Sequence, residues 1–237
     1  MECRSNNEFE QSIRYALPQW IAAVLKSGKY RNAGNPTQPH CRSRNAAIEG
    51  APMSVQLIKP RRFGDARGWF TEVYSEPAFA KLGITCTFVQ DNHSLSVPAY
   101  TLRGLHFQAP PRGQDKLVRC IRGRIWDVAV DVRKGSPTYG QWVGAELSAE
   151  NGHQLFIPVG FAHGFVTLEP DCEVTYKCSD TYAPEADGGI RWDSAGIGWP
   201  MPAGMTPELS DKDKVQPALA DFDSPFPYDG NPLQPLA

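Results

Sequence analysis

The sequence lacks the short motifs that mark most metal-binding and nucleotide-binding folds. Its six cysteines never form a C-x-x-C pair, and its five histidines form neither H-x-H nor H-E-x-x-H. No glycine-rich loop of the form G-x-G-x-x-G or G-x-x-x-x-G-K-S/T is present. We therefore expect no metal site and no resident cofactor.

Long apolar runs and a strong net charge are also missing. No stretch reaches the length of a membrane span, and the first residues lack the charged start, apolar core and cleavage site of a signal peptide. The 24 basic and 26 acidic residues give a net charge of -2, and the basic residues are scattered. We expect a cytoplasmic protein with reduced thiols that binds neither a membrane nor a nucleic acid.

The character of the chain changes near residue 53. Residues 1–52 hold an amphipathic piece interrupted by Pro18, then a polar stretch, which indicates a weakly ordered N-terminal extension. From Met53 onward, strand-like patterns continue to about residue 229. A chain of 237 residues can form one sizeable domain with tails. We predict an extension over 1–52, a domain over 53–229 and a C-terminal tail over 230–237.

Short strands dominate this domain. In the clearest one, residues 125–133, apolar side chains alternate with Asp127, Ala129, Asp131 and Arg133, so we expect one face to be buried.

Turn signals separate the strands. Gly123 predicts a hairpin between the strands before and after it, and residues 150–152 predict another. Only residues 77–82 suggest a short helix. Many short strands joined by tight turns favour an all-β sandwich or barrel.

One strand-like segment, Leu102–Gln108, concentrates reactive side chains. It holds Arg103 and His106, and Lys116 follows soon after. A histidine can accept a proton near neutral pH, and cations can stabilise an enolate oxygen, so this set suits proton removal beside a carbonyl. A lone strand histidine is nevertheless more often structural. Because Arg103 and His106 are an odd number of residues apart, both can share one face only if Gly104 forms a bulge.

Six segments in fixed order resemble the dTDP-4-dehydrorhamnose 3,5-epimerase family: residues 65–72, 90–94, 102–108, 135–138, 157–165 and 176–184. The resemblance spans about residues 53–229. It implies an all-β, cupin-type jelly-roll barrel with short peripheral helices, free of metal and homodimeric. It also implies an isomerase of dTDP-rhamnose biosynthesis, which inverts C3 and C5 of dTDP-4-dehydro-6-deoxy-D-glucose to give dTDP-4-dehydro-L-rhamnose.

The resemblance implies four catalytic residues. His106 matches the base, and Asp213 matches the carboxylate that orients it. Tyr176 matches the acid on the opposite face of the sugar, and strand alternation turns its side chain inward. Lys116 would stabilise the enolate. Taken alone, Asp213 suits an exposed position in the first turn of a short helix after Ser210.

The resemblance also implies nine substrate-binding residues. They are Arg67, Arg103, His163 and Lys212 at the diphosphate, Glu72, Gln90 and Asn92 at the nucleotide or sugar, Phe70 against the base, and Tyr182 near the sugar. Tyr182 would lie roughly 20 Å from Tyr176 along a straight strand, so we predict a bend at residues 179–180. In the family, the strand that carries residues 67–72 is exchanged with the neighbouring subunit.

Three other functions remain open at this point. Close relatives epimerise only C3 of a related nucleotide 4-keto-6-deoxysugar, and every catalytic match suits them too. A barrel that binds a sugar nucleotide without catalysis would need no acid and base on opposite faces. A metal-dependent cupin dioxygenase would need clustered ligands, which the sequence lacks.

Overall fold

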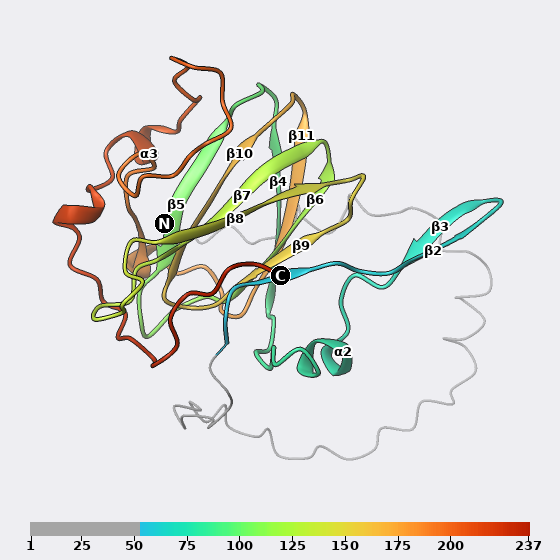
Figure 1. The fold of residues 1–237 in the computed structure, drawn as a ribbon, viewed down its shortest axis with the longest axis horizontal. Helices are drawn as coiled ribbons and strands as arrows, with labels where there is room; N and C mark the ends of the chain where they lie inside the picture. The colour runs from blue at the N-terminus through green and yellow to red at the C-terminus, as the bar shows by residue number, and fades with distance from the viewer. Residues whose placement is uncertain (1–52) are drawn as a thin grey trace, which may run out of the picture. The chain divides into compact units, whose positions relative to one another are not determined.

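The structure is a computed structural model that describes residues 53–237. The predicted N-terminal extension over 1–52 lies outside the described residues. The described chain forms two five-stranded antiparallel sheets and one separate hairpin (Figure 1). This is the all-β, cupin-like jelly roll that the sequence predicted.

The strand order defines the two sheets. The first sheet runs β1 (Gln56–Ile58), β9 (Gln154–Ile157), β6 (Lys116–Arg122), β11 (Cys172–Cys178) and β4 (Gln90–Ser96). The second sheet runs β12 (Asp187–Gly189), β5 (Leu102–Gln108), β10 (Phe161–Thr167), β7 (Arg124–Asp131) and β8 (Trp142–Ser148). The hairpin pairs β2 (Arg62–Asp65) with β3 (Gly68–Thr71) and projects from the body of the domain (Figure 1).

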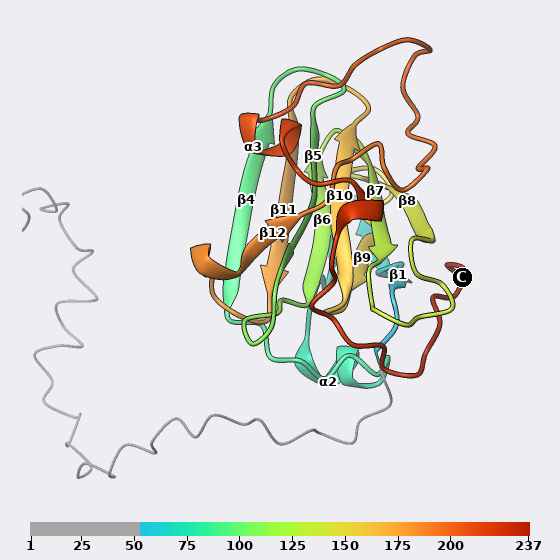
Figure 2. The same cartoon turned by 90° about the vertical axis from the view of Figure 1, so that its left-hand side faces the viewer.

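Helices are few and short. Within residues 53–237 the α-helices are α2 (Glu76–Ala80) and α3 (Asp211–Lys214), and two 3-10 turns span Pro184–Ala186 and Leu219–Asp221. The helix predicted over 77–82 is confirmed as α2, which lies at the opposite end of the strands from α3 (Figure 2). No helix of the described chain is long and apolar enough to cross a membrane.

Most connections carry the chain from one sheet to the other. The predicted hairpins at Gly123 and at residues 150–152 are wrong. Gly123 joins β6 to β7, and residues 150–152 join β8 to β9. In each case one strand belongs to the first sheet and the other to the second. The turns exist, and Gly123 has φ of 78°. A Cβ at Gly123 would lie 2.5 Å from Cys172 Sγ, so this crossing point needs glycine.

The main core fills the space between the sheets. It contains Val118 and Cys120 from β6 and Ala129 from β7, all completely buried. The expectation that only one face of residues 125–133 is buried is wrong. Val128 and Val130, on the outer face of the second sheet, are as buried as Ala129, since the later segment carrying Ile190 and Phe226 covers them.

The last residues belong to the packed domain. Leu233 and Leu236 pack against the core between the sheets, and the Leu233 N–H donates to Thr138 Oγ1 at 2.8 Å. The predicted tail over 230–237 is therefore not separate from the domain. Both leucines are partly buried, so each contributes less than the roughly 1.5–3 kcal/mol of a fully buried leucine, but together they help hold the C-terminal segment in place.

Candidate active site

A bulge in β5 brings two predicted site residues together. In the pairing of β10 with β5, His163 lies opposite His106, but Phe165 lies opposite Arg103, so β5 carries one extra residue. Gly104 has φ of 133°, and a Cβ there would lie 2.6 Å from the Cα of Gly164. The predicted glycine bulge is confirmed. Both Arg103 and His106 consequently line the same cavity.

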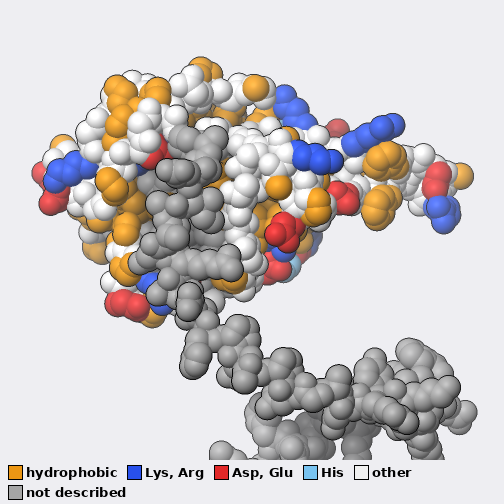
Figure 3. All heavy atoms as spheres, turned by 90° about the horizontal axis from the view of Figure 1, so that it is seen from below, with side chains coloured by type: hydrophobic (Ala, Val, Ile, Leu, Met, Phe, Trp, Pro, Cys, Tyr) orange, Lys and Arg blue, Asp and Glu red, His pale blue; other side chains and the backbone are white. Residues whose placement is uncertain are grey.

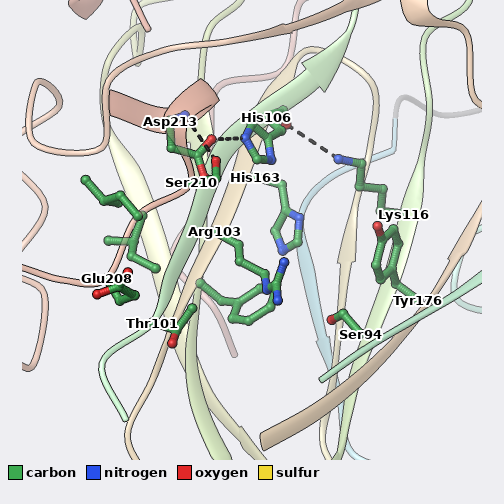
Figure 4. A pocket seen from close by; sticks show the side chains of 13 residues that line it. Ser94, Thr101, Arg103, His106, Lys116, His163, Tyr176, Glu208, Ser210 and Asp213 are labelled. Carbon is green, nitrogen blue, oxygen red and sulfur yellow. Dashed lines mark hydrogen bonds and ion pairs between the residues drawn. The ribbon is translucent and has the colours of Figure 1, made fainter. Parts of the chain in front are cut away.

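That cavity lies between the two sheets and has a volume of about 410 Å³. Six predicted site residues line it: Arg103, His106, Lys116, His163, Tyr176 and Asp213. His106 comes from the second sheet, whereas Lys116 and Tyr176 come from the first, and they project from different sides of the cavity (Figure 4). A second cavity of about 400 Å³ shares these three residues and adds Gln90, Asn92, Tyr182 and Lys212.

His106 is held by a carboxylate. Its Nε2 lies 2.5 Å from Oδ1 of Asp213, whose side chain is 3% exposed (Figure 4). Asp213 lies in the first turn of α3, and its N–H donates to the N-cap oxygen Ser210 Oγ at 3.2 Å. Burial acts to raise the pKa of Asp213, but the hydrogen bond to His106 and other donors hold it below the ordinary value. An ionised Asp213 accepts a hydrogen bond from the Nε2–H of His106, which leaves Nδ1 unprotonated and able to act as a base. The local sequence around Asp213 predicted an exposed side chain, and that prediction is wrong.

Tyr176 faces the cavity from β11. Alternation along this strand turns Val174, Tyr176 and Cys178 inward, and both Val174 and Cys178 are buried. The predicted orientation is therefore confirmed. Burial raises the pKa of the Tyr176 phenol, with a smaller contribution from Cys178. The phenol thus stays protonated at neutral pH and can donate a proton.

Lys116 begins β6 and is 9% exposed. Its Nζ lies 3.5 Å from the backbone carbonyl oxygen of His106 (Figure 4). Burial lowers the pKa of Lys116, while Cys178, Asp127 and Asp187 act in the opposite direction. A buried ammonium with few partners of its own can interact strongly with a developing oxyanion.

A second imidazole and carboxylate pair lies beside the first. His163 Nε2 is 2.8 Å from Oδ1 of Asp127, and the other carboxylate oxygen of Asp127 is buried without a hydrogen-bond partner among the described residues. Burial lowers the pKa of His163, so its ring is neutral. The expected role of His163 as a cation for the diphosphate does not fit these surroundings. A neutral imidazole can hydrogen-bond a phosphate but adds no charge.

The other predicted cations differ in their pairing. Arg103 donates to Ser96 Oγ and to the Leu95 carbonyl oxygen, each at 3.0 Å, and makes no ion pair within residues 53–237. Its charge is available to an anion. Lys212 lines the second cavity and forms an ion pair with Asp187. A phosphate would have to share Lys212 with that carboxylate.

The predicted bend at residues 179–180 is confirmed and carries Tyr182 to the second cavity. Arg112 clamps the bend, since its Nε and Nη2 donate to the two carboxylate oxygens of Asp180 at 2.7 and 2.9 Å. The hydrogen bond from Arg112 lowers the pKa of Asp180. Tyr182 itself donates from its hydroxyl to Asp187 Oδ2 at 3.3 Å.

Three predicted binding residues lie outside both cavities. Arg67 and Phe70 are on the projecting β2–β3 hairpin, and Glu72 follows it. Phe70 is 68% exposed, and the Arg67 side chain is 90% exposed. Hydrophobic and basic side chains gather on this projection, which is seen at the right of Figure 3. Within its own subunit the hairpin does not reach the site.

Several lining residues escaped the sequence analysis. They include Ser94, Thr101, Phe165, Glu208 and Ser210 in the first cavity, and Gln108, Gln114 and Asp187 in the second. Ser94 could have been found, because strand alternation places it on the same face as Gln90 and Asn92. The described residues hold no group of three or more metal-ligating side chains.

Comparison with known proteins gives one family. The family model described as dTDP-4-dehydrorhamnose 3,5-epimerase matches residues 50–221. A protein of that name from Sinorhizobium fredii is 54% identical over 174 residues, which cover 73% of this chain and 89% of the relative.

Solved structures agree. One is a dTDP-6-deoxy-D-glucose-3,5-epimerase from Legionella pneumophila in complex with dTDP-4-keto-L-rhamnose. It is 45% identical with a TM-score of 0.67, and the match covers 70% of this chain and 88% of that one. A 3'-monoepimerase from Streptomyces bikiniensis, in complex with dTDP-quinovose, is 32% identical with a TM-score of 0.65, covering 70% and 84%. On the family match and the level of identity, this chain belongs to the dTDP-4-dehydrorhamnose 3,5-epimerase family.

Proposed function

We propose that this protein inverts C3 and C5 of dTDP-4-dehydro-6-deoxy-D-glucose and so produces dTDP-4-dehydro-L-rhamnose. Both carbons flank the C4 carbonyl, so loss of either proton gives an enolate whose negative charge rests on the same oxygen. One base can therefore serve both centres. The observation that carries the proposal is a cavity with His106 and Asp213 on one side and Tyr176 and Lys116 on the other.

His106 acts as the base in this proposal. The bond to Asp213 stabilises the imidazolium that forms when Nδ1 takes the proton from carbon. Lys116 stabilises the enolate oxygen in a place where little water competes for it. Each abstraction breaks one C–H bond and leaves its electron pair in the enolate.

Tyr176 returns a proton to the opposite face of the ring. Delivery from that face makes the product the epimer, whereas return of the proton by His106 would restore the starting configuration. The raised pKa of Tyr176 keeps the phenol protonated before the step. The phenolate formed afterwards regains a proton from solvent, and the His106 imidazolium loses its proton there, so the enzyme ends each inversion unchanged.

Substrate binding divides between the two cavities. Arg103, which makes no ion pair with the described part of the chain, supports binding of the diphosphate, and His163 adds a neutral hydrogen bond. Gln90, Asn92, Tyr182 and Lys212 line the other cavity and would contact the rest of the nucleotide sugar.

We also propose a homodimer in which the β2–β3 hairpin enters the partner's site. The exposed Phe70 and Arg67 support this proposal, because aromatic and basic side chains on a projecting hairpin suit burial against another surface. Glu72 would accompany them. We further propose that the enzyme needs no metal and is cytoplasmic. The free thiols of the four described cysteines support the cytoplasmic location.

The test is incubation with dTDP-4-dehydro-6-deoxy-D-glucose in deuterated water, followed by NMR of the sugar. Deuterium at both C3 and C5 with inverted configuration is the expected result. Deuterium at C3 alone would identify a C3-only epimerase, and no incorporation would favour a non-catalytic binding barrel. His106→Ala should abolish turnover while the binding of dTDP persists. Stoichiometric iron in the purified protein would instead indicate a dioxygenase and overturn the proposal.

A further inference from the structure

Cys178 on β11 is paired between Gln90 on β4 and Lys116 on β6, two residues that line the second cavity. The register of β4, β11 and β6 aligns Gln90, Cys178 and Lys116 in one row across the strands. The next row on the same face aligns Asn92 with Tyr176. Directly paired side chains on a sheet face have Cβ atoms about 4.5–5.5 Å apart, so Gln90 and Lys116 are the cross-strand neighbours of Cys178.

A chain of hydrogen bonds ends at the sulfur of Cys178. The Tyr182 N–H donates to Gln90 Oε1 at 2.9 Å, and Gln90 Nε2 donates to Asn92 Oδ1 at 3.1 Å. Asn92 Nδ2 then lies 3.5 Å from Cys178 Sγ. A backbone N–H can only donate, so it fixes the orientation of both amides, and the sulfur must accept.

Cys178 is fully buried, and burial raises the pKa of its thiol although Lys116 acts in the opposite direction. The sulfur is therefore a neutral acceptor beside an ammonium that can only donate. A carboxylate in this place would pair with Lys116 and occupy the charge that the enolate needs. A neutral acceptor leaves that charge available.

We propose that Cys178 is a positioning residue, whose neutral sulfur anchors the Asn92–Gln90–Tyr182 chain and supports Lys116 without neutralising it. The proposal rests on the enolate chemistry proposed above. It assigns to Cys178 no contact with the substrate. Its action passes through Lys116 and Asn92.

Within residues 53–237, six groups that can carry charge lie around Lys116, besides the phenol of Tyr176 in the same cavity, and each can influence the protonation of Lys116. They are Cys178 from β11, Asp127 from β7, His163 from β10, His106 from β5, Asp187 from β12 and Lys212 from α3. Variants at Cys178 leave the other five in place, so a change in pH dependence can be attributed to the sulfur.

Two substitutions separate volume from hydrogen bonding. Cys178→Val removes the acceptor and adds about one methyl group of volume, which the Cys120→Val control also adds, whereas Cys178→Ser keeps an acceptor. Cys120→Val is the matched control, because Cys120 is equally buried and lies on β6, on the same strand face as Lys116 but four residues away. Thermal unfolding of each variant checks that it is folded.

Cys178→Val is expected to lower kcat about ten- to a hundred-fold, as small displacements of catalytic groups do, and to shift the basic limb of the kcat profile to lower pH. Cys178→Ser should stay within about threefold of the wild-type kcat, and Cys120→Val should match the wild type. A wild-type kcat and pH profile in Cys178→Val, or equal loss in the serine variant, would overturn the proposal. Cys178→Ala replaces the valine variant if the latter does not fold. An inactive wild-type enzyme would instead refute the proposed function.

Discussion

The imidazole of His106 on β5 lies 2.5 Å from the carboxylate of Asp213 on α3, although 107 residues separate them in the chain. The jelly roll creates this contact, because the segment after the last strand returns across the second sheet and places α3 over β5. The strand alone would present a histidine whose tautomer is not fixed. The pair provides a base with a fixed tautomer.

Replacing Asp213 tests the importance of that tautomer. Asp213→Asn keeps the shape but can donate to His106, which would leave Nδ1 protonated and unable to act as a base. We expect kcat to fall by roughly a hundred-fold or more, with dTDP binding measured by calorimetry little changed. Asp211→Asn is the control, because Asp211 belongs to the same helix but its side chain is fully exposed. Equal kcat values for the two variants would contradict this role.

Gly104→Ala tests the bulge. The positive φ and the 2.6 Å approach to Gly164 should together cost roughly 2–4 kcal/mol of unfolding free energy, measured by urea denaturation. Activity should fall further than stability explains, since Arg103 and His106 would no longer share a cavity. Gly196→Ala separates the two causes, because Gly196 has φ of 64° but open space around it. A similar small loss in both variants would show that close packing at Gly104 is unimportant.

The pH dependence of activity should report on Lys116. Enolate stabilisation needs the ammonium, so kcat should fall as the pH rises through a pKa that burial lowers from its usual 10.5. Tyr176 must also be protonated, but burial raises its pKa from 10.0, so Lys116 titrates first.

Lys116→Arg keeps its charge at high pH and should move the basic limb upward while reducing kcat. Lys177→Arg, at a lysine paired with Asp91, should leave the limb unmoved. If the basic limb of Lys116→Arg coincides with that of the wild type, the limb belongs to a group other than Lys116.

Mixing two inactive variants tests the exchange of the hairpin. In a dimer of His106→Ala with Arg67→Ala, the Arg67→Ala subunit keeps an intact base and receives an intact hairpin from its partner. Random reassembly should restore about a quarter of wild-type activity, because half the dimers are mixed and each has one complete site. The control mixes His106→Ala with Tyr176→Phe. Because these two residues line the same cavity of one subunit, this mixture should recover no activity. Activity no greater than the sum of the Arg67→Ala and His106→Ala proteins would rule out exchange.

Local patterns predicted the short strands and pointed to Arg103, His106 and Lys116, whereas the other predicted cavity residues came from the family resemblance. Alternation placed Tyr176 inward, and an odd spacing required the bulge at Gly104. The turns at Gly123 and at residues 150–152 were recognised, but a turn signal reports that the chain reverses and not which sheet it enters next. Both were therefore mistaken for hairpins.

Features that depend on distant segments were beyond local patterns. The outer face of β7 is buried because residues that follow it by more than fifty positions cover it. The neutral state of His163 depends on its burial by surrounding strands, which lowers its pKa although Asp127 on the neighbouring strand β7 acts in the opposite direction. Only the family resemblance could pair His106 with Asp213.

The most direct test of opposed acid and base follows Tyr176→Phe in deuterated water. His106 should still remove the protons from C3 and C5 and return deuterium to the same face, so NMR should show exchange with retained configuration and little inversion. His106→Ala should show no exchange at either carbon. Inversion by Tyr176→Phe at a rate close to that of the wild type, or loss of exchange in that variant, would contradict the placement of the two groups on opposite sides of the sugar.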